Sequence, residues 1–229
     1  MASGYGGYKG PTGGSAVSVS TWNKLDLINT AGIGYLFSFG STDAPGQNNN
    51  EFTCVYDSTS SGLVLLLGGD NYATYPGAPW NNGSWHNLVA TCPGSGTPSD
   101  LRLYLDGALL SPTTTSGLSQ KNTAVNNFFR VGKNVLGFGK YDGLVDEVAV
   151  WDVQLTASAV AVIYNGGFAT LDLNANQGFY TSASALQLWW RFEGTSSDQV
   201  INSGGGGVSR NGFITGGAVL PDDFSLDVP

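Results

Sequence analysis

Short apolar or alternating runs recur along the chain between clusters of turn-forming residues. Such a series of short runs is typical of the strands of a β-sandwich. It predicts an all-β protein, an antiparallel β-sandwich of about a dozen strands in one domain. The runs occupy residues 16–22, 33–39, 52–56, 63–67, 86–91, 101–105, 128–131, 144–151 and 186–192.

The clearest local prediction is a hairpin in the middle of the chain. In residues 101–105 leucine alternates with Arg102 and Tyr104, so the leucines share one face of a strand. Asp106-Gly107 follows at once, a dipeptide favoured in two-residue hairpin turns because both residues tolerate positive φ. Residues 109–110 then begin the return strand.

One short helix is predicted after the strand at 144–151. Thr156 can cap its start, and Asn165-Gly166-Gly167 can end it, because glycine accepts the left-handed conformation of a C-terminal cap. A helix this short is not stable alone and must dock on the sandwich. Its apolar residues recur at helical spacing: Ala157, Val160, Ala161 and Tyr164.

The two ends of the chain differ in composition from its middle. Residues 1–15, rich in glycine and tyrosine, predict a flexible arm, and residues 16–229 form the single sandwich domain. Residues 168–184 are expected to be a connector or polar loop. A glycine run at 204–207 precedes a last strand-like stretch at 212–220.

Charge and hydropathy exclude several functions. Only 11% of the residues are charged, and the net charge of −8 argues against binding nucleic acid, which needs clustered lysine and arginine. The longest apolar run, residues 63–67, is too short to cross a bilayer, and the first residues lack the apolar stretch of a signal peptide. We therefore expect no membrane insertion and no export by that route.

Two cysteines and one histidine are the remaining reactive side chains. Cys54 and Cys92 each lie in a predicted strand, and they are either two buried free thiols, the favoured interpretation, or a disulfide between adjacent strands. His86, the sole histidine, has no serine or cysteine motif around it. We interpret it as a structural hydrogen-bonding residue.

Four segments resemble, in order, the concanavalin A-like lectin/glucanase family with laminin G-like domains. They are WHNLVAT at 85–91, LRLYLDG at 101–107, FRVG at 129–132 and YDGLVDEVAVWD at 141–152. The helix at 155–165 is similar to the one that often closes this domain. The resemblance implies a concanavalin A-like jelly roll, and it is specific for the fold but weak for function.

One departure from the family order is informative. LWWRFE at 188–193 and NGFI at 211–214 resemble the segment that usually opens such a domain, but here they come last. We interpret this as circular permutation, in which residues 186–229 supply strands that are usually N-terminal. A sandwich allows such a rearrangement when its two ends are neighbours.

A looser resemblance is to virion proteins of marine tailed phages. It rests on YNGG at 164–167, WWRF at 189–192 and DVP at 227–229. It implies a bacteriophage structural protein on the virion surface, such as a capsid decoration protein, head fibre or tail appendage. Its partners would then be other virion proteins and further copies of itself in a homo-oligomer.

The sequence predicts no enzyme. The family's glucanases need two or more carboxylates on one strand, so that acid and nucleophile flank the glycosidic bond. Asp146 and Glu147 are adjacent and are expected to point to opposite faces of their strand. The only other glutamates, Glu51 and Glu193, do not complete the pattern.

The resemblance also implies a structural calcium ion. By motif its ligands would include Asp146, with Glu147 and Glu193, and loop carbonyls would complete about six to eight oxygens. The alternative is that Asp146 accepts hydrogen bonds from a neighbouring turn or from Arg191.

The alternative function is a carbohydrate-binding, lectin-like module for host-surface glycan. Tyr72, Tyr75 and Trp80 lie in a segment rich in glycine, proline and asparagine, where exposed rings could stack on sugars. The same residues could instead pin a loop that folds back on the sandwich.

Overall fold

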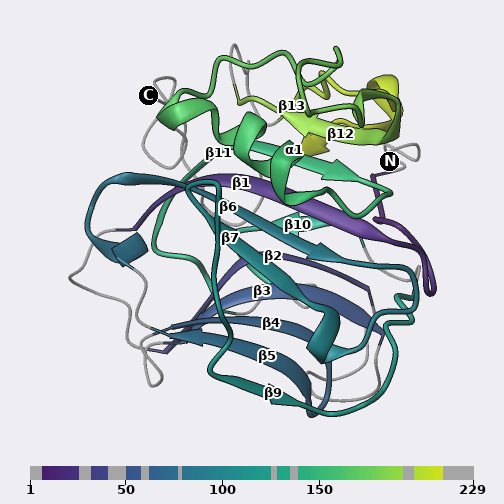
Figure 1. Cartoon of the computed structure of the whole chain (residues 1–229). Coiled ribbons are helices and arrows are strands. Elements are labelled where there is room, and N and C mark those ends of the chain that lie inside the picture. The colour runs from purple at the N-terminus through teal and green to yellow at the C-terminus, as the bar shows by residue number, and fades with distance from the viewer. Residues whose placement is uncertain are drawn as a thin grey trace.

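The computed structural model describes residues 7–25, 32–40, 50–57, 62–76, 79–124, 128–134, 139–192 and 199–213. Two antiparallel sheets of six strands face each other, and one helix, α1, lies outside them (Figure 1). The predicted all-β sandwich with a single short α-helix is therefore confirmed for these residues.

The first sheet has the strand order β12-β11-β1-β6-β7-β8. Its strands pair antiparallel throughout, and β12 adds the late segment of the chain to the edge beside β11. Whether that segment is permuted relative to other family members stays a prediction. The strands are β1 Val17–Leu25, β6 Trp85–Cys92, β7 Arg102–Leu105, β8 Ala108–Leu109, β11 Gly143–Trp151 and β12 Leu186–Trp190.

The second sheet has the order β10-β2-β3-β4-β5-β9. Three successive hairpins build its centre from β2 to β5, and two short strands close its edges. A separate two-stranded pair joins β13 Gln199–Val200 to β14 Gly212–Phe213. The strands are β2 Ile33–Gly40, β3 Glu51–Asp57, β4 Gly62–Gly68, β5 Asn71–Pro76, β9 Thr114–Ser116 and β10 Arg130–Val131.

The main core fills the space between the two sheets. Alternate residues of facing strands supply it, as period-two patterning requires. In its aromatic centre Phe37 and Phe39 of the second sheet contact both Phe52 and Phe129. The Phe129 ring centroid lies 5.6 Å from that of Trp190 in the first sheet. Phe129 therefore joins the two sheets.

A third layer covers the outer face of the first sheet. It consists of α1 (Ala157–Tyr164) and the segment between α1 and β12, which lie on that side of the molecule in Figure 1. The Trp151 indole Nε1 donates to the Tyr180 hydroxyl over 2.9 Å, and that hydroxyl donates to the Leu173 carbonyl over 2.7 Å. All three residues are buried. Residues 168–184 therefore connect α1 to β12, as expected, and are fixed to the sheet through Leu173 and Tyr180, while most of their other side chains are exposed.

The hairpin and the helix form as predicted. Asp106 and Gly107 have φ values of 51° and 78°, which positions β8 to pair with β7. Thr156 Oγ1 accepts a hydrogen bond from the Ala159 backbone N–H, and Asn165 adopts the left-handed conformation at the C-terminal cap. Both elements are encoded by local turn and cap chemistry.

The prediction of a flexible arm over residues 1–15 is wrong for residues 7–15, and residues 1–6 lie outside the described ranges. The Tyr8 carbonyl accepts a hydrogen bond from the Phe129 backbone over 2.7 Å, and Tyr8 packs against the core. Gly13 forms an antiparallel bridge with Thr123, and its carbonyl accepts a bond from the buried Lys121 ammonium. Backbone hydrogen bonds and the lysine therefore hold this segment on the sandwich.

The two cysteines are free and buried, as favoured from the sequence. Cys54 lies on β3 in the second sheet and Cys92 on β6 in the first. Burial raises the pKa of Cys54, and it raises that of Cys92 to about 11 although Lys121 partly offsets the effect. Both groups are therefore thiols rather than thiolates at neutral pH.

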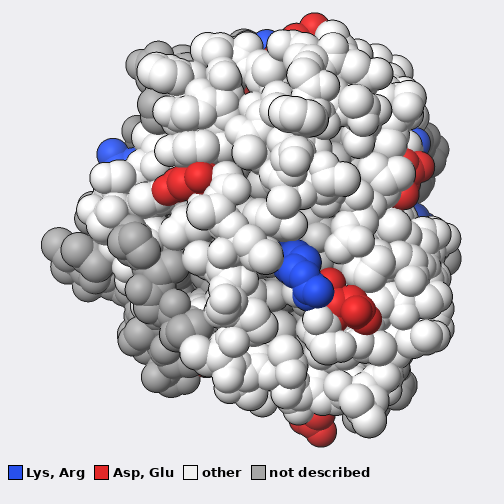
Figure 2. All heavy atoms as spheres, viewed as in Figure 1, with Lys and Arg blue, Asp and Glu red and all other residues white. Residues whose placement is uncertain are grey.

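No helix within the described ranges is both long enough and apolar enough to span a membrane. Surface charges are also sparse. In the view of Figure 2 most of the surface is uncharged, and near its centre a basic side chain lies beside an acidic one.

Candidate functional site

The carboxylates proposed as metal ligands lie at a bulge in β11. In the pairing of β1 with β11, Trp22 lies opposite Asp146 and Ser20 lies opposite Ala149. The single residue Thr21 therefore lies opposite two residues of β11, which is a β-bulge. Glu147 has a φ of 48°, and its backbone N–H donates to Asp146 Oδ1 over 2.7 Å. The expectation that these two carboxylates point to opposite faces is wrong, because a bulge interrupts the regular alternation.

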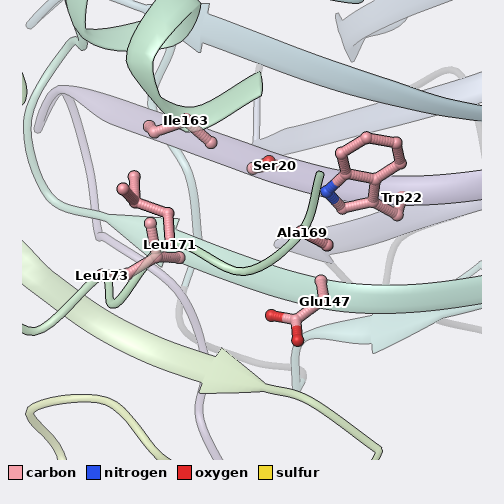
Figure 3. A pocket seen from close by; sticks show the side chains of 7 residues that line it. All are labelled: Ser20, Trp22, Glu147, Ile163, Ala169, Leu171 and Leu173. Carbon is pink, nitrogen blue, oxygen red and sulfur yellow. The ribbon is translucent and has the colours of Figure 1, made fainter. Parts of the chain in front are cut away.

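The Glu147 carboxylate is enclosed beneath the third layer. Its Oε2 accepts a hydrogen bond of 2.5 Å from Trp189 Nε1, and its Oε1 accepts one of 3.0 Å from Arg191 Nε. Figure 3 shows the carboxylate beside a small pocket between β1, β11 and the segment after α1. The other residues that line the pocket are mostly apolar: Ser20, Trp22, Ile163, Ala169, Leu171 and Leu173.

This environment does not fit Glu147 as a calcium ligand. Both carboxylate oxygens already accept hydrogen bonds, and the Arg191 guanidinium beside them disfavours a second cation. Glu193 lies outside the described residues, and calcium bound through Asp146 stays a prediction. Within the described ranges, no three His, Cys, Asp or Glu side chains gather as a metal-binding group.

The proposed aromatic ligand site is not a surface loop. Tyr72 and Tyr75 belong to strand β5, and their odd spacing sends them to opposite faces. Tyr75 and Trp80 are only 1% exposed and lie in the main core, where the Tyr75 hydroxyl donates to the Leu101 carbonyl over 3.1 Å. The prediction that these two rings contact glycan is therefore wrong. Tyr72 is half-buried on the outer face.

His86 has the structural role expected from the sequence. Its Nδ1 lies 2.7 Å from Asp106 Oδ2, and its Nε2 lies 3.0 Å from Asn82 Oδ1. Asp106 Oδ1 also accepts a hydrogen bond from the Asn87 backbone. The imidazole thereby ties the turn between β7 and β8 to the segment before β6.

The outer face of the second sheet, called the open face, is the main candidate surface. In Figure 1 the helix and the segment between α1 and β12 lie on the side of the first sheet, away from it. The registers align its outward residues in two rows that cross the strands. The first row is Arg130, Ser38, Thr53, Leu66, Tyr72 and Ser116, and the second is Tyr35, Val55, Val64, Thr74 and Thr114.

The open face combines aromatic rings with polar groups. Tyr35, Leu66, Tyr72 and Thr74 are half-buried, so each presents part of its side chain to solvent. Thr114 at the β9 edge is exposed. Ser38, Thr53 and Val55, in the middle of the two rows, are at most 3% exposed, so the accessible part of the face is its β4–β5–β9 side. There the Tyr72 ring lies with the Thr74 and Thr114 hydroxyls, which suits a ligand with both apolar and hydroxyl faces.

A hydrogen-bonded polar group lies at the β2–β3 side of the open face. Thr53 Oγ1 donates to Glu51 Oε2 over 3.0 Å, and the Tyr35 hydroxyl is hydrogen-bonded to the buried Asn134 side chain. Burial raises the pKa of Tyr35, with a smaller rise from the nearby Glu51 charge. Burial also raises the pKa of Glu51, and the Thr53 hydroxyl partly offsets that rise.

The carboxylates of the open face cannot form a glycosidase pair. Glu51 and Asp57 share a face of β3 but are six residues apart, which places them roughly 20 Å from each other along an extended strand. Retaining and inverting enzymes need their two carboxyl groups about 5–10 Å apart. The described carboxylates on this face therefore do not support hydrolysis.

The Glu51→Gln variant is expected to be more stable than the parent at neutral pH. Burial disfavours the charged carboxylate, so the folded-state pKa lies above the unfolded value. Between those two values the folded state binds more protons, and stability falls as the pH rises. The variant should lack this fall when denaturation is measured from about pH 4 to 7. Asp142→Asn, at an exposed carboxylate, is the control, and parallel curves for parent and Glu51→Gln would contradict the expectation.

Sequence reasoning missed Tyr35, Thr53 and Arg130 as open-face residues. The available signal was the alternation within 33–39 and 52–56, which sends every second residue away from the core. What the sequence did not show was which of the two sheets α1 and the segment after it cover. That depends on where α1 and residues 168–184 pack.

The sequence matches one family of known proteins over most of its length. A family model described as the concanavalin A-like lectin/glucanases superfamily matches residues 8–161. The chain belongs to this superfamily. The match begins at Tyr8, within the segment that is bound to the sandwich, and ends inside α1. A comparison with curated proteins finds no match.

Solved structures support the concanavalin A-like fold. A candidate carbohydrate binding protein from Bacteroides ovatus aligns with a TM-score of 0.59 and 14% identity over 90% of this chain. The alignment covers 53% of that structure, so this chain spans about half its length.

Two further structures are more distant. A Ruminococcus gnavus sialidase carbohydrate-binding module, bound to α2,6 sialyllactose, aligns with a TM-score of 0.46 and 14% identity, covering 68% of this chain and 85% of its own. A heptameric pentraxin from Limulus polyphemus aligns with a TM-score of 0.44 and 14% identity. That alignment covers 86% of this chain and 83% of the pentraxin chain. Both likenesses are too weak to bear on the ligands or the assembly of this chain.

Proposed function

We propose that this protein is a non-catalytic carbohydrate-binding module that holds glycan against the open face. The observation that carries this proposal is the group of partly exposed side chains on the β4–β5–β9 side of that face: Leu66, Tyr72, Thr74 and Thr114. The Tyr72 ring is half-buried and stands among the threonine and serine hydroxyls of β5 and β9. Membership of a superfamily that contains lectins supports the same class of function.

The chemistry of the open face suits a sugar ring. Tyr72 offers a flat face to the apolar side of a pyranose and carries a hydroxyl group suited to hydrogen bonding. Thr74 and Thr114 face each other across β5 and β9, and each hydroxyl can both donate and accept. These groups lie on strands rather than loops, so little conformational freedom is lost on binding.

The absence of catalysis is also part of the proposal. Among the described residues, the open-face carboxylates are too far apart for acid and nucleophile, and Glu147 is held by Trp189 and Arg191 under the third layer. The proposed function is therefore glycan binding without hydrolysis.

The Tyr72→Ala variant tests the proposed surface. We expect glycan affinity to fall about tenfold, because a half-buried aromatic contact is lost, while stability changes little. A glycan array identifies the ligand, and titration calorimetry compares parent and variant. Phe179→Ala is the matched control, since that ring is 74% exposed in the third layer, away from the open face. An array without hits for the folded protein, or equal affinity in both variants, would refute the proposal.

A virion-surface role is a separate proposal and rests on the sequence resemblance alone. Glycan binding and a place on a particle are compatible, because a surface component can also help a particle attach. Mass spectrometry of purified particles tests it, and absence of the protein from them would count against it. The proposed virion partners and homo-oligomeric state belong to the same proposal and are tested by the same measurement.

A further inference from the structure

A small pocket lies on the outer face of the first sheet, beneath the segment that follows α1. The sheet contributes Ser20 and Trp22 of β1 and Glu147 of β11, and each of these residues is at most 7% exposed. The pocket is partly open to solvent and admits one small group, on the order of a water molecule or a hydroxyl. Its other walls are apolar (Figure 3): Ile163, Ala169, Leu171 and Leu173.

Two hydrogen-bond donors in this pocket have no acceptor among the described residues. The Trp22 indole nitrogen lies on the side of its ring that faces the pocket in Figure 3, and no group in the described ranges accepts its proton. Ser20 Oγ accepts a bond of 3.1 Å from Asn87 Nδ2, and its own proton is not donated within those ranges either. The fully buried Asn87 Oδ1, beside Ser20, also has no partner there. Buried polar groups nearly always have a partner, so these three point to a ligand.

The pairing of β1 with β6 explains why these groups lie together. Trp22 is directly opposite Asn87, and Ser20 is two residues away on the same face of β1. With the bulge in β11, the Glu147 carboxylate also borders this pocket. The Trp22 ring is stacked on Tyr164 of α1, with a centroid distance of 6.1 Å. The side chains of the pocket are therefore held in place before any ligand binds, which lowers the entropic cost of binding.

The charges around the pocket favour a neutral ligand. Glu147 and Arg191 form an ion pair, with 3.0 Å between Arg191 Nε and Glu147 Oε1. The carboxylate would repel an added anion, and the guanidinium would repel an added cation. A hydroxyl group avoids both costs, because it can accept from the Trp22 N–H and the Ser20 O–H and also donate. The Glu147 carboxylate can accept that donated bond, since a carboxylate offers about four lone-pair sites.

We propose that this pocket is a second ligand site, which binds a neutral primary alcohol group on a short carbon arm. The hydroxyl oxygen accepts from Trp22 and Ser20, and the carbon that carries it contacts the half-buried rim at Ala169 and Leu171. The arm can be the hydroxymethyl group of a saccharide or the end of a free small alcohol. The site lies on the first sheet, away from the open face, so it does not depend on the proposed glycan-binding function.

Indole N–H signals in NMR spectra of the nitrogen-labelled full chain read the pocket directly. The chain has six tryptophans, and Trp22→Phe assigns the Trp22 signal, because it removes this N–H and keeps a ring against Tyr164. The probes are two matched pairs: methyl glucoside with its 6-deoxy analogue, and 1-propanol with 1-chloropropane. We expect a probe with the primary hydroxyl to shift the Trp22 signal and its partner without that hydroxyl to leave it unchanged.

Two variants test the contacts by ligand-observed NMR titration. Ser20→Ala and Trp22→Phe should each weaken binding of the hydroxyl-bearing probe about fivefold, the effect of one lost hydrogen bond. Tyr72→Ala, on the open face, is the matched control and should bind the probe as the parent does. Circular dichroism establishes that each variant is folded.

A Trp22 shift that needs the primary hydroxyl, with weaker binding in Ser20→Ala, supports the proposal. A response to methyl glucoside identifies a saccharide arm, and a response to 1-propanol alone identifies a free alcohol. No Trp22 shift with any probe, or equal binding with and without the hydroxyl, overturns the proposal. Binding lost in Tyr72→Ala would place the probe on the open face and overturn it as well. Failure at the pocket therefore leaves the open-face function standing, and failure on the open face leaves the pocket.

Discussion

The Trp80→Ala variant is expected to lose about 3–5 kcal/mol of unfolding free energy, because removing a large buried ring leaves a cavity in the core. Trp80 is 1% exposed, and its ring meets that of Tyr56 edge-on at a centroid distance of 5.0 Å. It lies in η1 (Pro79–Asn81) and belongs to the main core. Chemical denaturation monitored by tryptophan fluorescence and circular dichroism measures the loss.

Two comparison variants make the Trp80 result specific. Trp80→Phe should cost much less, because it keeps most of the ring and removes an indole N–H that has no partner among the described residues. Tyr72→Ala should leave stability nearly unchanged. A Trp80→Ala protein as stable as the parent would contradict the assignment of this ring to the core.

The Glu147→Ala variant is expected to lose about 2–3 kcal/mol of unfolding free energy. The substitution leaves the buried Trp189 indole N–H without its acceptor, whereas Arg191 is 35% exposed and can turn to water. We therefore place the loss below that of a fully buried broken ion pair. Glu147→Gln keeps an acceptor for the indole and should lose less than the alanine variant.

A double-mutant cycle separates the indole contact from other effects of Glu147. Trp189→Phe removes the donor, so the combined Glu147→Ala/Trp189→Phe variant should cost less than the sum of the two single variants. Strictly additive losses would show that the hydrogen bond between these two side chains contributes nothing measurable to stability.

How much could be predicted from the sequence depended on the range of the interactions. The Asp106-Gly107 turn and the Thr156 cap are set by neighbouring residues, and both were predicted. Strand β5 was hidden by flanking glycine and proline, although Ala73 and Tyr75 alternate inward with Tyr72 and Thr74 outward.

The candidate site needed long-range information. Arg130 and Tyr72 are far apart in the chain, and only the pairing of five strands places them in one row. The bulge at Glu147 likewise results from the pairing of β1 with β11, and the residues around Glu147 do not predict it. Residue types indicated which side chains could contact a ligand, but the strand topology determines which of those side chains lie on the same surface.

The placement of Cys54 and Cys92, one on each sheet and both buried, supplies a built-in reporter of opening motions. A thiol reagent can modify either residue only after the region around it opens, so the modification rate in native buffer measures the free energy of that opening. Equal rates at Cys54 and Cys92 would mean that the sheets separate in one cooperative event. Unequal rates would identify the sheet that opens first, without any label being introduced into the protein.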